Sequence, residues 1–326
     1  MNDLNDDIDL PPQKGLGQFR YRSLRAQTRD ASRSVRRWWW EYLRLSKDYW
    51  MVCMTSKEGA PATKDEAFAK IFLDFGNIYE STFEDWWVST GSNLFAERRD
   101  PPKVKQINPR EVSPEESRSS IFVEIPLTLS YETVENQIRR ILDTYSDVRP
   151  ANRLETSTSD YPIAVALTRM RVLEQLHELY CLHRELIAKP KALSVLYKGK
   201  SSTEYEIRAD LFRIGKIMRL SPSNERLTGE PEEIQAKLRA MRSLVSRNLA
   251  KAQTLIANVE KGIFASYEEL SPAEDRFTSA QKKKHKELEE QWWSVSLFSS
   301  DSSISLEDVK RIPYSGDYTN LNASNL

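Results

Sequence analysis

Residues 38–50 read WWWEYLRLSKDYW, and this aromatic stretch decides the first part of the predicted fold. Trp39, Leu43 and Trp50 recur at spacings that suit one helical face or two adjacent faces. Large apolar residues continue at similar density further along, at Phe68, Ile71, Phe72, Phe75, Phe83, Trp86, Trp87, Leu94 and Phe95. We therefore predict that residues 20–99 form one helical domain with an aromatic core.

Polar stretches separate this block from the rest of the chain. Residues 1–19 are acidic and carry Pro and Gly, so we expect a disordered leader. Residues 100–119 contain four prolines among charged residues, and residues 146–160 are polar and aperiodic. Both stretches are typical of linkers.

A short periodic segment lies between the two linkers. Residues 120–127 are rich in β-branched and aromatic residues, which predicts a strand that ends near Pro126. Ser130 is a suitable N-cap for a helix that runs to Asp143. We interpret 120–145 as a small βα insert. Its single strand needs a partner, for which a second copy in a homo-oligomer is one candidate.

The C-terminal part is predicted to be helical over 161–265. Apolar residues at helical spacing indicate three helices, at about 161–188, 204–220 and 232–261, with Pro190 ending the first and Gly262 the third. Periodicity is lost after residue 266, so we expect an irregular tail over 266–326. The predicted fold class is therefore mainly α, with a helix-turn-helix-like C-terminal domain.

Composition excludes several classes of protein. Lys and Arg number 48 and so do Asp and Glu, so the whole surface is not built to coat nucleic acid, although a local basic face is allowed. The two cysteines lie far apart in sequence, which favours a reducing compartment. No secretory signal and no apolar run of about 18 residues is present, so we expect a cytoplasmic protein without a membrane span.

The predicted helix over 232–261 carries the chemistry best suited to a partner. One face of this helix is an apolar stripe. Hydroxyl and basic side chains lie outside the stripe, and they can reach phosphates and base edges. This candidate DNA-binding site consists of Arg239, Arg242, Ser243, Ser246, Arg247 and Lys251. Together, the helices predicted over 204–220 and 232–261 suggest a helix-turn-helix, although its turn is longer than the usual 3–4 residues. A solvated basic face on a bundle helix is the alternative.

Two further segments leave their partners open. Residues 20–37 hold seven arginines and one acid, and this arm suits either phosphates or an acidic protein surface. The tryptophans at 38–40 are expected in the core, whereas exposed ones would indicate a protein partner of the N-terminal domain.

No catalytic or cofactor-binding constellation is evident. Asp74-Phe75-Gly76 spells a kinase metal-binding motif, but the rest of the kinase set is missing, so we expect Phe75 in the core and Gly76 at a helix end. His177 and Cys181, with Glu174 one turn earlier, offer too few ligands for zinc. We expect neither an enzyme nor a cofactor nor a metal.

Two blocks carry a resemblance to a known group of proteins. The first includes WWWEYLRLS at 38–46, Asp74-Phe75-Gly76, Trp86-Trp87 and Leu94-Phe95-Ala96-Glu97, and the second runs from Val245 to Phe264. Both resemble blocks of uncharacterised bacterial proteins encoded by mobile elements and phages. The resemblance implies a mobile-element setting but no activity. We therefore expect a non-catalytic DNA-binding accessory protein, with a protein–protein adaptor or structural subunit of such an assembly as the alternative.

Overall fold

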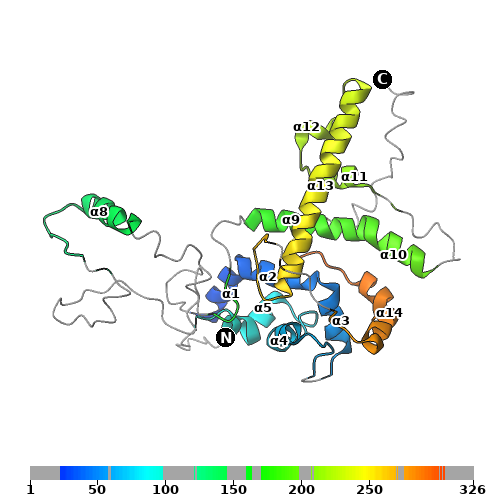
Figure 1. The fold of residues 1–326 in the computed structure, drawn as a ribbon, viewed down its shortest axis with the longest axis horizontal. Helices are drawn as coiled ribbons and strands as arrows, with labels where there is room; N and C mark the ends of the chain where they lie inside the picture. The colour runs from blue at the N-terminus through cyan, green and yellow to red at the C-terminus, as the bar shows by residue number, and fades with distance from the viewer. Residues whose placement is uncertain are drawn as a thin grey trace, which may run out of the picture.

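The computed structural model describes residues 23–57, 60–97, 121, 123–144, 159–163, 170–197, 207, 209–268, 270, 275–300, 302 and 304. These residues form helices and no strand, which confirms the predicted mainly α class (Figure 1). Isolated β-bridges join Lys57 to Ala60 and Ile163 to Phe264. The predicted leader at 1–19, the linker at 100–119 and most of the linker at 146–160 lie outside the described residues.

The N-terminal part is a set of short helices. They are α1 Leu24–Ser32, α2 Val35–Arg44, α3 Lys47–Thr55, α4 Glu66–Phe75, α5 Phe83–Trp86, the π-helical η1 Trp87–Gly91 and α6 Ser92–Leu94. Hydroxyl or carboxylate side chains accept a backbone N–H at several helix starts, at Ser23, Ser34, Ser46, Asp65 and Thr82. As predicted, Phe75 is buried and Gly76 ends α4 with a φ of 70°.

The remaining helices include one much longer than the others. They are α8 Tyr131–Asp143, α9 Met170–His183, the π-helical η4 Arg184–Ala188, α10 Lys189–Leu196, α11 Leu211–Ile217, α12 Pro222–Glu225, α13 Pro231–Val259 and α14 Ser279–Ser294. The prediction that Pro190 stops its helix is wrong, because α10 begins with this proline near its first position. The π-helical turn of η4 precedes it and changes the backbone hydrogen-bond register that a proline would otherwise break.

The predicted strand over 120–127 is wrong as far as the structure describes it. Residues 121 and 123–126 form no strand, since no other segment pairs with them in the described part of the chain. The helix predicted after it is confirmed as α8. Its N-cap is Ser130, whose side chain accepts the backbone N–H of Thr133.

The main hydrophobic core joins described helices from both ends of the chain, between Ala31 and Leu297. Trp39 is fully buried, and its ring lies against those of Phe75, Phe95, Tyr161 and Phe264 at centroid distances of 5.3–6.2 Å. The same cluster also takes in residues of α9, the C-terminal end of α13 and α14. The predicted ranges 20–99 and 161–265 therefore share one core, while their division into separate domains stays a prediction.

The prediction of an irregular tail from residue 266 is wrong for α14. This helix starts with a capping box between Thr278 and Gln281. Near its other end Trp292 is buried, with its ring 5.7 Å from that of Trp50. Most other side chains of α14 are exposed or half-buried, so the sequence shows no broad apolar stripe for this helix.

Candidate nucleic-acid interface

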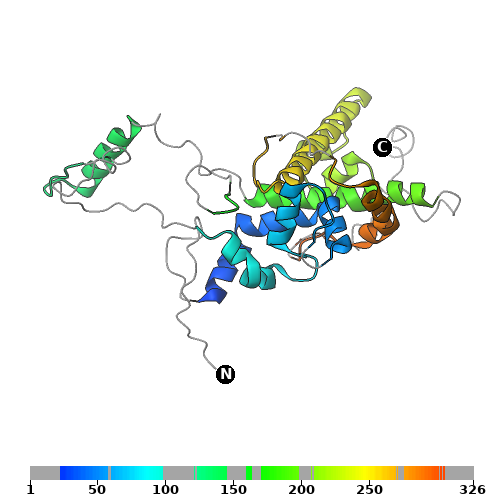
Figure 2. The same ribbon diagram turned by 60° about the horizontal axis from the view of Figure 1, so that its bottom comes forward.

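The long helix α13 is supported along its N-terminal half by α11 and α12. Figures 1 and 2 show this half projecting away from the N-terminal helices, with α11 beside it. Contact between α11 and α13 is close at Gly215, where an added Cβ would lie 2.5 Å from the Met241 sulfur. The glycine therefore lets the two helices approach, and α13 has a rigid backing.

One face of α13 is buried from Leu238 to the C-terminal end of the helix. The buried side chains are Leu238, Met241, Val245, Leu249, Ala252, Leu255, Ile256 and Val259, with Asn258 beside them. The helix ends as predicted at Gly262, whose φ is 75°, with backbone hydrogen bonds from Gly262 to Val259 and from Ile263 to Asn258. This pairing is a Schellman motif, and it fixes where the helix stops.

The six candidate residues lie outside this buried stripe, and each of them is exposed: Arg239, Arg242, Ser243, Ser246, Arg247 and Lys251. Arg242 forms an ion pair with Asp210 at 2.7 Å, and the ammonium of Lys251 lies 5.9 Å from the ring centre of Tyr267. Arg239 and Arg247 form no ion pair with any residue that the structure describes. These two guanidinium groups are thus the ones best placed to meet a partner.

The charge on this helix is strongly one-sided. From residue 234 to residue 259 the sequence holds five basic residues and no Asp or Glu. Over the longer range 209–259, nine basic residues face five acidic ones, a net charge of +4 in a chain whose total is zero. Four of the five basic residues of α13 are exposed, so the helix carries a local basic face.

Sequence reasoning missed basic residues around the turn between α11 and α13. Lys216 and Arg219 are exposed, and Arg219 has a φ of 49°, in the left-handed region where glycine is usual. Helices often end with a residue in the left-handed conformation, and Arg219 is that residue for α11. Its basic side chain is thereby held on the turn, and no spacing rule in the sequence would have pointed to it.

The predicted helix-turn-helix has an unusual turn. The helix expected over 204–220 is observed as α11, Leu211–Ile217, among the residues described there. Thirteen residues, 218–230, separate it from α13, and they include α12. The connection is therefore longer than the 3–4 residues of the usual motif, and α12 packs against α13 within it.

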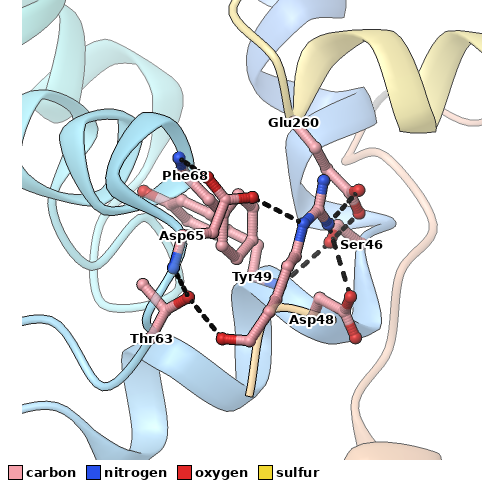
Figure 3. Close-up of polar contacts among 8 residues, drawn as sticks. Ser46, Asp48, Tyr49, Thr63, Asp65, Phe68 and Glu260 are labelled. Atoms are coloured by element: carbon pink, nitrogen blue, oxygen red, sulfur yellow. Dashed lines mark hydrogen bonds and ion pairs between the residues drawn. The ribbon is translucent and has the colours of Figure 1, made fainter. Parts of the chain in front are cut away.

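The C-terminal end of α13 is fixed by a partly buried charge cluster around the buried Arg276 (Figure 3). Glu260, the residue after the helix, accepts a hydrogen bond from Ser46 at 2.5 Å and pairs with Arg276 at 2.5 Å. Arg276 also pairs with Asp48 at 3.3 Å and Asp65 at 3.2 Å. Burial raises the pKa of the Glu260 carboxyl, while Arg276 and Ser46 act in the opposite direction.

The backbone of Arg276 is held as firmly as its side chain. Its carbonyl oxygen accepts hydrogen bonds from the backbone N–H of Lys64 at 3.0 Å and the hydroxyl of Thr63 at 2.9 Å. The guanidinium carbon lies 4.3 Å from the ring centre of Phe68. Helices α3, α4 and α13 are therefore tied together at this point, which positions the base of the candidate interface.

The arginine-rich segment 20–37 is only partly available to a partner. Arg25, Arg29 and Arg33 are exposed on and after α1, whereas Arg36 is buried. Arg37 pairs with the buried Glu41 at 3.6 Å and donates a hydrogen bond to Ser299. The other two arginines lie outside the described residues.

The tryptophans and the candidate metal ligands belong to the core. Trp39 and Trp40 are buried, and Trp38 packs half-buried with its ring 5.5 Å from that of His177. His177 is fully buried, and its Nδ1 lies 3.8 Å from the Cys181 sulfur. Burial lowers the pKa of His177 to about 3. No cluster of three or more potential ligands occurs among the described residues.

The chain was compared with protein-family models, curated proteins and solved structures. No family model, curated protein or solved structure matches the chain. Among the described helices, none is both long enough and apolar enough to cross a bilayer.

Proposed function

We propose that this chain is a non-catalytic, cytoplasmic DNA-binding accessory protein of a mobile genetic element or phage, and that the exposed face of α13 lies on duplex DNA. The observation that carries the proposal is the one-sided helix. A continuous buried stripe holds α13 in place, and its other face presents cations with no acid between residues 234 and 259.

The dimensions and chemistry of α13 support this proposal. A helix of 29 residues is about 44 Å long, which spans more than one turn of DNA. Arginine and lysine neutralise phosphates, and Ser243 and Ser246 can donate hydrogen bonds to them. Ala236, Ala240 and Ala250 lie exposed among these residues, so bulky side chains do not hold the backbone away from a groove.

The test is a mobility-shift titration of the full chain against duplex DNA at low salt. The variant Arg239→Ala, Arg247→Ala removes two exposed guanidinium groups of α13 that form no ion pair with a described residue. A matched control, Lys283→Ala, Lys284→Ala, removes two exposed charges from α14. We expect the first variant to lose about 2 kcal/mol of binding free energy, because charge-assisted contacts are lost. The control should bind nearly as the wild type does.

Two results would contradict the proposal. The first is a wild-type protein that shifts no duplex DNA at about 50 mM salt, where phosphate contacts dominate. The second is an equal loss in both variants, because that result would assign binding to overall charge rather than to α13. Melting temperatures of both variants should match the wild type, since none of the four side chains is buried.

The alternative function is an adaptor or structural subunit that binds a protein through the Trp-rich N-terminal domain. That alternative needs tryptophans at the surface. Trp39 is 0% exposed and Trp40 is 4% exposed, so the block serves the core instead. Burial of these rings therefore favours the DNA proposal over a partner at this position.

A further inference from the structure

Arg242 differs from the other candidate DNA-binding cations because the described structure already gives it an acidic partner. Its guanidinium donates a hydrogen bond from Nη2 to Oδ2 of Asp210 at 2.7 Å. Arg239, Arg247 and Lys251 form no ion pair with any residue that the structure describes. The side chains of Arg242 and Asp210 are 46% and 36% exposed, so an anion in solvent can reach the pair.

Asp210 uses its two carboxylate oxygens for different purposes. Oδ1 accepts the backbone N–H of Arg213 at 2.9 Å and caps the start of α11. Oδ2 accepts the hydrogen bond from Arg242. The cap holds the carboxylate at the end of α11, and α11 packs closely on α13 at Gly215. Asp210 is therefore fixed beside Arg242 by the fold, and Arg242 can leave Oδ2 without removing the cap.

A DNA phosphate offers Arg242 the same kind of acceptor as a carboxylate. Arginine binds both groups through charge-assisted hydrogen bonds, and its planar guanidinium suits either one. An exposed ion pair contributes little to stability, so an exchange of partners costs little. Duplex DNA carries one negative charge for about every 1.7 Å of its axis, so a duplex on α13 brings several anions to a place that holds one carboxylate. The displaced carboxylate then repels the same phosphates, because like charges lie close together.

We propose that Asp210 is an intramolecular competitor of DNA phosphate for Arg242. In the free protein Asp210 occupies the guanidinium, and a duplex that binds to α13 takes its place. Asp210 thereby lowers both the affinity for DNA and the number of cations that are free to contact phosphates. This inference rests on the proposed function, because it concerns the regulation of the same face of α13.

The variant Asp210→Asn isolates the competing oxygen. Asparagine keeps the Oδ1 that caps α11, and it replaces the charged Oδ2 by a neutral amide nitrogen that cannot accept a hydrogen bond from arginine. Fluorescence anisotropy titrations of a labelled duplex with the full chain, at about 50 mM salt, give the dissociation constant. We expect this variant to bind DNA at least about threefold more tightly than the wild type, the effect of one exposed ion pair. Its slope of log affinity against log salt concentration should be steeper by about 0.9, which is one more phosphate contact.

Two comparisons separate the ion pair from a general gain in positive charge. Glu232→Gln removes an exposed acid from the first turn of α13, and this acid forms no ion pair with a described residue. It should change the DNA affinity by less than Asp210→Asn does. In an Arg242→Gln background, Asp210→Asn should give no greater gain than Glu232→Gln gives, because no guanidinium is left to release.

A second variant guards against an effect on folding. Asp210→Ser also keeps a capping oxygen, so it should show the same gain in affinity, and both variants should melt as the wild type does. A wild type that binds no duplex DNA contradicts the proposed function and this inference with it. A wild type that binds while both Asp210 variants bind no more tightly overturns this inference alone. So does an equal gain from Glu232→Gln, or a gain that persists in the Arg242→Gln background.

Discussion

His177 lies inside the core between the rings of Trp38 and Tyr42, with centroid distances of 5.5 and 5.7 Å. Burial lowers its pKa to about 3, and the nearby Arg44 and Arg37 act in the same direction. The ring is therefore neutral in the folded protein at any moderate pH. Sequence spacing brought His177 and Cys181 together correctly, but only the structure shows the aromatic rings that surround the histidine.

The buried histidine makes stability depend on pH. In the unfolded chain its pKa returns to about 6.5. The stabilising contribution of the neutral His177 to the free energy of unfolding is fully present above pH 6.5. It is lost as the pH falls toward 3, because in that range the unfolded chain binds a proton that the folded chain does not. Between pH 6.5 and pH 5 we expect His177 to cost about 2 kcal/mol of unfolding free energy.

Urea unfolding of the wild type and of His177→Phe at pH 7 and pH 5 checks this prediction. Burial raises the pKa of Glu41 and of Glu260, which works in the opposite direction, so the comparison between the two proteins isolates the histidine. The variant should lose less stability on acidification than the wild type. Equal losses in the two proteins would contradict a buried neutral histidine.

Trp39 provides a second prediction, because its ring contacts four other aromatic rings and is fully buried. Trp39→Ala should lower the free energy of unfolding by about 3–5 kcal/mol, the cost of emptying a large core site. Trp38→Ala is the matched control, since that ring is only half-buried. Denaturant titrations that give equal losses for both would contradict the central place of Trp39.

Helices with a regular apolar stripe and clear end residues could be predicted from sequence, whereas helices held by distant partners could not. Helix α13 has its stripe and Gly262, and α8 has Ser130 at its start. Helix α14 instead depends on Arg184, which donates hydrogen bonds to the carbonyl oxygens of Trp292 and Val295 at its C-terminal end. No local pattern reveals a contact across more than 100 residues.

The packing of α11 on α13 depends on Gly215, and this gives a prediction for the pair. An added methyl group would lie 2.5 Å from the Met241 sulfur and 2.9 Å from a Val245 methyl. Gly215→Ala should therefore destabilise the protein by about 1–3 kcal/mol, because overpacking outweighs the gain in helix propensity.

Thermal melting of Gly215→Ala, Met241→Ala and the double variant measures this contact. The removed methionine side chain makes room for the new methyl, so the double variant should be less destabilised than the sum of the single ones. Strictly additive losses would show that the two helices do not meet at these residues.

The shared core has a consequence for the whole chain. Residues before 98 and after 158 contribute to one hydrophobic cluster, so the two parts should stay together when the chain between them is cut. We expect that cleavage at a protease site inserted between Pro109 and Arg110 yields fragments that co-elute on native size-exclusion chromatography. Fragments that separate without denaturant would contradict the shared core.

More of the candidate interface than of the supporting fold could be predicted from the sequence. The apolar stripe and the two arginines Arg239 and Arg247 lie on one helix, so helical periodicity alone separates them. The pairing of Arg242 with Asp210 and the position of Arg219 on the turn depend on how α11 packs, which requires the three-dimensional structure.

The salt dependence of DNA binding tests the central claim, that cations of α13 contact phosphates. Each phosphate contact adds about 0.9 to the slope of log affinity against log salt concentration. Fluorescence anisotropy titrations of a labelled duplex at several salt concentrations give this slope for the wild type and for Arg239→Ala, Arg247→Ala. We predict that the variant has a slope smaller by about 1.8, which is two contacts. Equal slopes for the two proteins would contradict the claim.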